Sequence, residues 1–415
     1  MSRTARSATQ GRVGTGFTDA ELDRLGKLLA PLKRDGSPFT SGERPPREAV
    51  FVEPQLVAEV EFSAWTSAGS LRHPSYKGLR EDKTASEVVR EDFTVARVEA
   101  EPEAISEPLS IHETGANSAT TTVEGRELKL SNLAKPLYPQ AGLSKRNVID
   151  FYAAVAETII AHLHGRALTV KRWPDGVDGK AFFQKQAPAH RPEWVRTVTV
   201  PTREKPIDYL LADDRATLVW LANLAALELH VPLQRAEHNE RPTALVFDLD
   251  PGAPATAIDC CRVALTLQGM FENLGLQSFA KTSGKKGLQL YVPLNDPKVS
   301  FAQTKPFAKT VAELLEEADP ELVVSRMTKT RREGRVLIDW SQNDINKTTV
   351  CVYSLRATER PTVSTPLLWD EVRAALDSGD EAALRFEAST VLERIAEHGD
   401  LFAPVLSLVQ KLPAV

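Results

Sequence analysis

The sequence predicts an α+β fold in which helices flank mixed β-sheets, preceded by a small β-barrel. The chain has 415 residues, of which 42% are apolar and 26% charged, so it is long enough to bury the cores of two domains. Helical and strand periodicities alternate throughout its C-terminal part. Residues 93–122 contain five Glu, one Arg and no Lys among many Ser, Thr and Ala residues, a composition typical of a flexible linker.

The predicted N-terminal unit covers residues 11–92 and follows a disordered stretch at residues 1–10. Apolar residues recur at helical spacing over residues 18–32, and Thr18 can cap that helix. Farther along, alternate residues are apolar and are expected on one face of a strand: Leu56, Ala58, Val60 and Phe62. A small barrel with one helix fits both patterns.

The predicted C-terminal unit covers residues 123–415 and mixes both periods. Ser144 can cap a helix over residues 145–163, and Gly165 follows its end. Further helices are expected at residues 217–229, 254–274 and 301–318, with two more after Trp369. Strands are expected in the β-rich runs ALTVKRW, AFFQKQ, ALVFDLD, LQSFAKT, GLQLYVPL, LVVSRM and RVLIDW.

Several function classes find no support in the composition. The three cysteines form neither an even disulfide framework nor a CxxC spacing, and no HExxH pair occurs, so we expect a reducing compartment and no zinc chemistry. There is no run of about 18 apolar residues and no secretory signal, which predicts a soluble cytoplasmic protein. The net charge of −5 does not itself indicate a polyanionic partner, although an overall balance can hide a local basic groove.

The segment ALVFDLDPG places two carboxylates on one face of a strand. Because side chains alternate faces, Asp248 and Asp250 point together, opposite the apolar face. Like charges about 7 Å apart repel unless a cation lies between them, and hard oxygen ligands suit Mg²⁺ or Mn²⁺. On spacing alone, a solvated strand end accounts equally well for the pair.

A third carboxylate, Asp339, lies within the apolar run RVLIDW. A charge in so apolar a strand is not explained by packing. Three Asp residues on neighbouring strands would bind two divalent cations and serve a phosphoryl displacement. The alternative is a surface-facing Asp on an edge strand.

Basic residues and glycines accompany these carboxylates. The turn that holds Ser283, Gly284 and Lys286 can present backbone N–H groups and positive charge to a phosphate, although it is not a P-loop and such a turn is usually only a hairpin tip. Residues 325–335 are rich in Arg. A second basic group, which includes Lys135, Lys145 and Lys171, precedes Phe182 and Phe183, and basic residues with aromatics are typical of a nucleic-acid surface. Core packing of at least one of the two Phe is equally compatible.

These residues resemble a known family. From Leu130 to about Val372 the chain is similar to the polymerase domain of the bacterial ligase D of non-homologous end joining, within the archaeo-eukaryotic primase (primase-polymerase) superfamily. The matching stretches occur in order: NLAKPLYP, KRWPDGV, FFQKQ, WLANLAALELH, VFDLDPG, TSGKKGL, IDWSQN, KTTVCVYSLRA and TVSTPLLWDEV. The resemblance implies a primase-polymerase catalytic domain.

The resemblance also implies an activity and a set of site residues. It implies a template-dependent DNA repair polymerase that fills short gaps or extends ends at DNA breaks, takes nucleoside triphosphates including ribonucleotides, and uses two divalent cations, Mn²⁺ or Mg²⁺. The catalytic and metal-binding residues would be Asp248, Asp250 and Asp339. The nucleotide-binding residues would be Lys171, His230, Ser283, Gly284, Lys286, Gln289, Arg332 and Arg356. Gapped or broken duplex DNA would be bound through its 5′-phosphate by Lys135 and Lys145, and through stacked template bases by Phe182 and Phe183.

The chain departs from the family pattern in two places. Between His230 and Asp248 the stretch is shorter than usual and ELHV replaces the common ELHP, so the local loop is expected to differ. The second departure is at position 289. The turn normally continues as SGxxGxH, whereas this chain has Gln289, which forms hydrogen bonds but carries no charge. Reduced nucleotide affinity or rate is expected. The alternative from another class is a non-catalytic protein that bridges DNA ends or docks a ligase with a decayed nucleotide site, although retention of all three Asp residues argues against it.

Residues 11–92 resemble a different module, the C-terminal OB-fold of ATP-dependent DNA ligases. The matches are GRVGTGFTDAELDRL, SPF, VEPQLVAEVEFSAWT and LRHPSYKGLREDK. The tetrapeptide KRDG at residues 33–36 mimics the ligase nucleophile motif KxDG, but it lies inside the OB-like unit, so we expect no ligase activity in cis. The resemblance suggests a module that holds duplex DNA or docks a separate ligase, with the end-binding Ku protein as a further partner.

Overall fold

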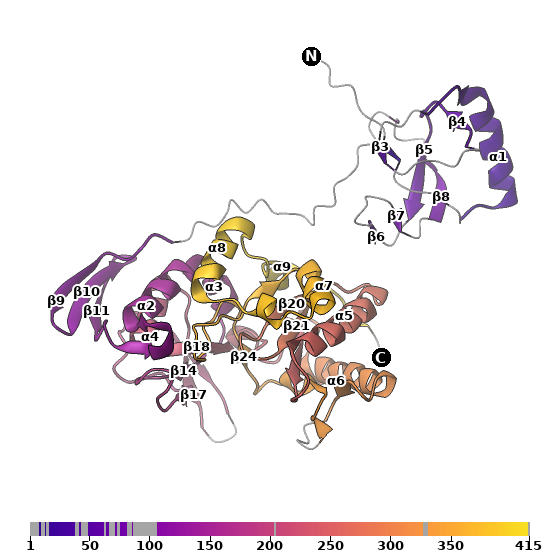
Figure 1. The fold of residues 1–415 in the computed structure, drawn as a ribbon. Helices are drawn as coiled ribbons and strands as arrows, with labels where there is room; N and C mark the ends of the chain where they lie inside the picture. The colour runs from indigo at the N-terminus through magenta and orange to yellow at the C-terminus, as the bar shows by residue number, and fades with distance from the viewer. Residues whose placement is uncertain are drawn as a thin grey trace, which may run out of the picture. The chain divides into compact units, whose positions relative to one another are not determined.

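The computed structural model divides into two compact units, Met1–Arg97 and Val98–Val415 (Figure 1). In the C-terminal unit the structure describes residues 106–413 except 203–204 and 327–330. In the N-terminal unit it describes residues 8–9, 13, 16–37, 41–42, 49–61, 64–65, 71–72, 75–80 and 85. None of the helices within these ranges has the length and apolar character needed to cross a membrane.

The N-terminal unit combines helix α1 (Asp19–Leu29) with short paired strands. The helix begins where Thr18 Oγ1 accepts a hydrogen bond from the backbone N–H of Glu21 at 3.3 Å, as its cap pattern predicts, and it runs into the 3₁₀ turn η1 (Ala30–Leu32). Strand pairs join β1 to β3, β2 to β4, β5 to β8 and β6 to β7. The strands are β1 (Ala8–Thr9), β2 (Lys33–Arg34), β3 (Ser41–Gly42), β4 (Phe51–Val52), β5 (Val57–Glu61), β6 (Ala64–Trp65), β7 (Leu71–Arg72) and β8 (Ser75–Arg80).

Two predictions for this unit are corrected by the structure. Residues 8–9 of the stretch predicted as disordered form β1, and the rest of residues 1–10 lies outside the described residues. The predicted apolar face of β5 is wrong because Leu56 and Ala58 are exposed. The register with β8 shifts between Glu59 and Val60, and such a shift moves alternate side chains to the other face. Phe62 lies outside the described residues.

Two sheets organise the C-terminal unit. The six-stranded sheet has the order β22-β23-β19-β21-β20-β25, and the four-stranded sheet has the order β15-β14-β18-β24. Their strands are β14 (Thr169–Arg172), β15 (Phe182–Gln184), β18 (Ala226–Val231), β19 (Ala244–Pro251), β20 (Phe279–Thr282), β21 (Leu288–Pro293), β22 (Val323–Val324), β23 (Val336–Asp339), β24 (Thr349–Val350) and β25 (Pro366–Leu367).

Helices and smaller strand groups surround these sheets (Figure 1). The helices are α2 (Lys145–Ala154), α3 (Ala156–Leu163), α4 (Arg215–Asn223), α5 (Ala257–Asn273), α6 (Phe301–Ala318), α7 (Trp369–Ser378), α8 (Ala388–His398) and α9 (Pro404–Ser407). The 3₁₀ turns are η3 (Pro139–Ala141), η4 (Ala236–His238), η6 (Trp340–Gln342) and η7 (Glu381–Leu384). The remaining strands are β9 (Ile111–Gly115), β10 (Ser118–Val123), β11 (Arg126–Ser131), β12 (Pro136–Tyr138), β13 (Leu143–Ser144), β16 (Thr197–Val200) and β17 (Ile207–Leu210).

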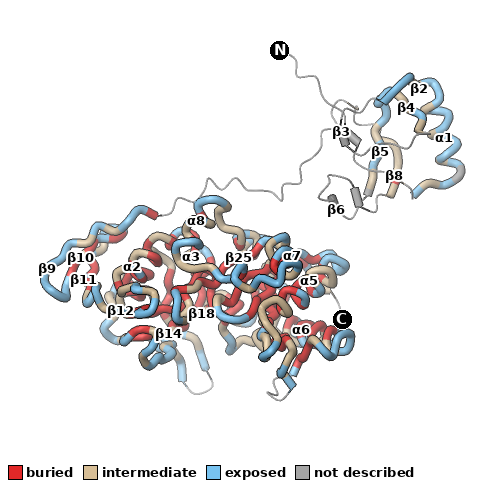
Figure 2. Tube along the Cα trace, viewed as in Figure 1, coloured by how far each residue is buried: buried red, intermediate tan, exposed pale blue. Residues whose placement is uncertain are grey.

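The core has two parts, one on each face of the six-stranded sheet. Leu245, Phe247 and Leu249 of β19 pack with residues of α5, α6 and α7 on one face. Val246 of β19 and Tyr291 of β21 belong to the other cluster, which includes α2, α3 and β18. Buried residues accordingly concentrate along the central strands and on the helix faces that cover them (Figure 2). The side chains at the even-numbered positions of β19 therefore point toward the four-stranded sheet.

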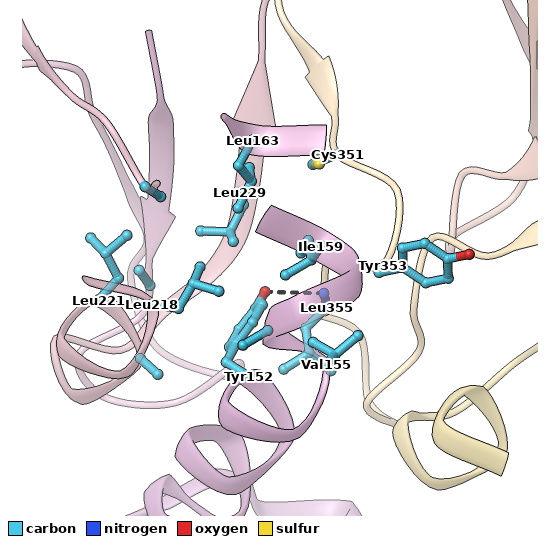
Figure 3. Close-up of a cluster of buried hydrophobic side chains, with 14 of the residues drawn as sticks. Tyr152, Val155, Ile159, Leu163, Leu218, Leu221, Leu229, Cys351, Tyr353 and Leu355 are labelled. Carbon is cyan, nitrogen blue, oxygen red and sulfur yellow. Dashed lines mark hydrogen bonds between the residues drawn. The ribbon is translucent and has the colours of Figure 1, made fainter. Parts of the chain in front are cut away.

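A buried tyrosine joins the helical layer to the segment after β24 (Figure 3). Tyr152 of α2 donates a hydrogen bond to the carbonyl of Leu227 at 2.6 Å and accepts one from the backbone N–H of Leu355 at 3.1 Å. Ile159 and Leu229 pack in the same cluster. These contacts hold the segment that carries Arg356 against β18.

Three predicted boundaries in this unit are corrected. The linker predicted over residues 93–122 is wrong in its last part, because residues 111–115 and 118–122 lie in β9 and β10. The Thr residues of this segment favour a strand, and alternate residues of β10 are buried. The helix predicted over residues 145–163 is two helices separated at Val155. The helix predicted over residues 217–229 ends at Asn223, Ala225 adopts φ +55°, and ALELHV forms β18. The helix predicted over residues 301–318 has those bounds.

Candidate active site

Asp248, Asp250 and Asp339 lie on one face of two paired strands. Strands β19 and β23 are antiparallel, with Asp248 directly opposite Asp339 and Asp250 opposite Leu337. Opposed residues project to the same face with Cβ atoms about 4.5–5.5 Å apart. Asp250 shares that face by alternation. The face is the one that looks toward the four-stranded sheet, because Val246 two residues earlier packs there.

Burial and neighbouring carboxylates raise the pKa of Asp248 and of Asp250. Burial, followed by the charges of Asp250 and Asp339, raises the pKa of Asp248 to about 7. Burial and Asp339 also raise the pKa of Asp250, against the opposing effect of Arg332. Negative charge is therefore concentrated here beyond what the surrounding cations neutralise, which is the condition that favours a bound cation.

The donor set fits a hard divalent cation, although the side chains are not arranged as a finished cage. Within the described residues no group of three or more His, Cys, Asp or Glu side chains is placed to hold a metal ion. Asp339 Oδ1 accepts hydrogen bonds from the backbone N–H and the hydroxyl of Ser341, and Oδ2 accepts one from Gln342 at 2.8 Å. Three carboxylates on one strand face are oxygen donors that Mg²⁺ and Mn²⁺ prefer.

Beside the carboxylates, one buried glutamate gathers three basic side chains. Glu228 of β18 contacts His230 Nε2 at 3.0 Å, Lys285 Nζ at 3.0 Å and Arg356 Nε at 3.2 Å, and its side chain is 2% exposed. Hydrogen bonding to His230 and the charges of Arg356 and Lys285 outweigh burial and hold the pKa of Glu228 well below its ordinary value. We call these four residues the Glu228 cluster. Its net charge is positive because Lys285 and Arg356 outnumber the single carboxylate, and protonation of His230 adds one more positive charge.

A hydrogen bond connects the turn after β20 to this cluster. Arg356 Nη1 donates to the carbonyl of Ser283 at 2.6 Å, and the Ser283 hydroxyl accepts from the backbone N–H groups of Lys285 and Gly287. Gly284 adopts φ +71°, and a Cβ there would lie 2.6 Å from Arg356 Cγ, so only glycine fits. Lys286 is exposed at the tip of the turn, while Lys285 reaches into the cluster.

The aromatic pair on β15 is exposed. Phe182 and Phe183 have exposed fractions of 45% and 59%, so the reading in which one of them packs in the core is wrong. Lys171 Nζ lies 5.0 Å from the Phe183 ring centroid, and the Phe183 ring meets His230 edge-on at 5.7 Å. Lys171 is also directly opposite Glu228 in the β14–β18 pairing. The aromatic pair thus adjoins the Glu228 cluster.

Lys135 and Lys145 lie together at another edge. The backbone N–H of Lys145 donates to the carbonyl of Lys135 at 2.8 Å, and Lys145 Nζ donates to the carbonyl of Ser131 at 2.7 Å. Burial, with the charges of Lys135 and Arg172, lowers the pKa of Lys145 to about 8. Lys135 pairs with Asp175 at 2.8 Å. A buried amine with cationic neighbours has affinity for an anion.

A hollow of about 360 Å³ opens beside Asp339. Strands β22 and β23 are parallel and both end there, and open positions at the carboxyl ends of parallel strands commonly bind ligands. The hollow is lined by Lys309, Glu313, Ser325, Arg326, Asp339, Trp340 and Ser341.

Three residues of this region were not predicted from the sequence as site residues: Glu228, Lys281 and Gln342. The ELH pattern offered a signal for Glu228, because residues two apart in a strand share a face with His230. Lys281 and Gln342 offered none, since their partners are distant in sequence or lie in an irregular turn.

The fold is that of a primase-polymerase domain, as comparisons with known proteins show. Residues 144–402 match the family model "LigD, primase-polymerase domain", and residues 2–83 match "ATP dependent DNA ligase C terminal region". The solved "Polymerase Domain from Mycobacterium tuberculosis Ligase D in complex with DNA" is 41% identical, with a TM-score of 0.63 over 68% of this chain and 99% of that chain. The chain belongs to the LigD primase-polymerase family, which confirms the predicted family and fold class.

Curated relatives extend this result. The "Multifunctional non-homologous end joining protein LigD" of Mycolicibacterium smegmatis is 41% identical over 280 residues, or 67% of this chain and 36% of that protein. The protein of the same name from Pseudomonas aeruginosa is 30% identical over 370 residues, or 87% of this chain and 42% of that protein. The chain therefore spans well under half the length of these relatives.

Proposed function

We propose that this protein is a template-dependent DNA repair polymerase that fills short gaps or extends ends at DNA breaks. The 3′-hydroxyl of a primer attacks the α-phosphorus of a nucleoside triphosphate, ribonucleotides included, and pyrophosphate leaves. The observation that carries the proposal is the cross-strand pairing of Asp248 with Asp339, with Asp250 on the same face and the Glu228 cluster beside them.

In this proposal the three carboxylates hold two divalent cations, Mn²⁺ or Mg²⁺. Such cations supply activation of the attacking hydroxyl and neutralisation of charge on the leaving group. Lys171, His230, Ser283, Gly284, Lys286, Arg332 and Arg356 serve the nucleotide, whereas the amide of the predicted nucleotide-binding residue Gln289 is bonded to Asp248 and Lys281. Lys285 joins them, because its ammonium is anchored on Glu228 within reach of the same space.

For the DNA, we assign the 5′-phosphate beyond the gap to Lys135 and Lys145 and the template bases to Phe182 and Phe183. Lys145, whose pKa is lowered by burial and by its cationic neighbours, suits a phosphate, and exposed rings suit base stacking. The relatives' names connect them to non-homologous end joining, so a separate ligase and the end-binding Ku protein are the partners we propose.

A primer-extension assay on gapped DNA tests the function. We expect incorporation with Mn²⁺ or Mg²⁺, and stronger extension when the downstream strand carries a 5′-phosphate. Binding of the same DNA with no incorporation under either cation would overturn the proposal and support the non-catalytic end-bridging function.

The role of the N-terminal unit needs its own measurement. We propose that this OB-like unit holds duplex DNA or docks a ligase. Removal of residues 1–95 should weaken binding to nicked DNA while incorporation on a saturating gapped substrate is retained. Unchanged affinity for nicked DNA would argue against a DNA-holding role.

A further inference from the structure

A fully buried ammonium lies behind the carboxylates, and the proposed reaction does not use it. Lys281 of β20 is 0% exposed. Its Nζ donates to Gln289 Oε1 at 2.6 Å, to Ser364 Oγ at 2.7 Å and to the carbonyl of Val350 at 3.2 Å. An ammonium has three N–H donors, so these three acceptors satisfy it completely.

Gln289 connects this ammonium to a candidate metal ligand. Its Nε2 donates to Asp248 Oδ1 at 3.1 Å, and the residue is buried on β21, directly opposite both Asp248 and Lys281 in the two strand pairings. When Lys281 is protonated and Asp248 is ionised, the lysine can only donate and the carboxylate can only accept, so the Gln289 amide then has one possible orientation. The Ser364 hydroxyl in turn donates its hydrogen to the carbonyl of Thr282 at 2.8 Å. A lone pair of the Ser364 oxygen therefore accepts the hydrogen bond from Lys281.

We propose that Lys281 and Gln289 are positioning residues that orient the Asp248 carboxylate for cation binding. The Gln289 N–H fixes Oδ1, so that Oδ2 is presented to the shared face with Asp250 and Asp339. The Lys281 charge, one amide away from Asp248, offsets part of the repulsion among the three carboxylates. This proposal deepens the proposed function and rests on it.

The departure from the family pattern has a physical meaning in this arrangement. A neutral imidazole at position 289 can also accept from Lys281 with one nitrogen and donate to Asp248 with the other. A protonated imidazole is donor-only and would have no lone pair for the Lys281 ammonium. Glutamine keeps both the acceptor and the donor at every pH, so Gln289 can connect Lys281 to Asp248 without carrying a charge of its own.

The test measures catalysis and Mn²⁺ binding in Gln289→Leu, Gln289→His and Lys281→Met. Mn²⁺ affinity is followed by the electron paramagnetic resonance of the free ion. Loss of an outer partner of a metal ligand typically lowers affinity or activity about 10–100-fold. We expect Gln289→Leu and Lys281→Met each to lower kcat and Mn²⁺ affinity by about tenfold, with KM for the nucleotide changed less than twofold, and Gln289→His to restore most of both.

Two controls separate positioning from general damage. Gln410→Leu removes another buried glutamine amide, one that bonds to Gln277 and Pro293 away from the site, and it should leave Mn²⁺ affinity unchanged. The double variant of Lys281 and Gln289 should lose little more than either single variant, because both act through Asp248.

The inference would be overturned by wild-type Mn²⁺ affinity in well-folded Gln289→Leu, or by a loss that falls on KM for the nucleotide alone. Failure of the proposed function has a different signature. In that case the wild type binds Mn²⁺ and responds to Gln289→Leu, yet incorporates no nucleotide.

Discussion

The carboxylate face of β19 and β23 and the Glu228 cluster are neighbours with opposite electrostatic designs. Three carboxylates share the first region, where burial and mutual repulsion raise the pKa of Asp248 and Asp250. In the second, one buried carboxylate holds three basic side chains and its pKa is lowered. The first region gains stability when a cation binds. The second holds its charges in place before any ligand arrives, and the excess positive charge is free to meet a phosphate.

The largest effect is expected from the carboxylate face. Asp248→Ala or Asp339→Ala removes an oxygen donor from the strand pair, so extension of a gapped duplex should fall to background. Affinity for the same DNA, measured by fluorescence anisotropy, should stay within about twofold, because these residues do not belong to the phosphate-binding groups. Substitution of Asp377, which is exposed on α7, by Ala is the control. Wild-type extension in Asp248→Ala would refute the assignment.

The Glu228 cluster should respond in both stability and nucleotide binding. Glu228→Gln leaves His230, Lys285 and Arg356 without their common anion, and breaking a buried charge pair typically costs about 3–5 kcal/mol. Urea unfolding should show this loss, and KM for the nucleotide should rise. Exposed Glu127→Gln should change neither. A variant with full stability and normal KM would mean that Glu228 does not organise the cluster.

Substitution in the aromatic pair tests whether the surface around Phe182 and Phe183 binds the template strand. Phe183→Ala should weaken binding of a template overhang by about 1–3 kcal/mol, the range for base stacking on one aromatic ring. Fluorescence anisotropy with an overhang and with a blunt duplex gives the comparison, since only the overhang offers unstacked bases. An equal loss for both substrates would contradict a template role.

The smallest effect concerns pH and Lys145. Its pKa is lowered to about 8, so its ammonium loses the proton as pH rises from 7 to 9, whereas an ordinary lysine, with a pKa of about 10.4, stays charged. The advantage given by a downstream 5′-phosphate is the ratio of the KM for gapped DNA without the phosphate to the KM for gapped DNA with it. This ratio should therefore decrease as the pH rises from 7 to 9. Lys145→Met should show little advantage at any of these pH values, and exposed Lys129→Met should behave as the wild type. A constant ratio in the wild type would contradict the assignment.

Local patterns predicted much of the fold correctly. The alternation in ALVFDLD indicated that Asp248 and Asp250 share a face, and burial in β19 alternates from Phe247 to Asp250. The cap at Thr18 and the bounds of α6 followed from residues within one turn. The errors came where periodicity was ambiguous or composition misled. The apolar run after Trp220 contains both a helix and β18, and the Ser- and Thr-rich segment before Val123 forms a strand.

The site depended more on distant contacts. Phe182 and Phe183 lie side by side in the sequence, yet their shared exposure depends on β15 being the edge strand of its sheet. Lys281 looked like an ordinary residue before a glycine turn, and its burial follows from Ser364 and Val350, which are far along the chain.

The amino-acid sequence by itself determined the strand alternation, the helix caps, the pair of carboxylates on one strand and the family to which the chain belongs, because each depends on residues close in sequence or on ordered motifs. Only the tertiary structure decided that Asp339 stands opposite Asp248, that Glu228 gathers its three basic partners and that Lys281 reaches Asp248 through Gln289. Strand register and burial arise from the packing of the whole domain, and no local window contains that information.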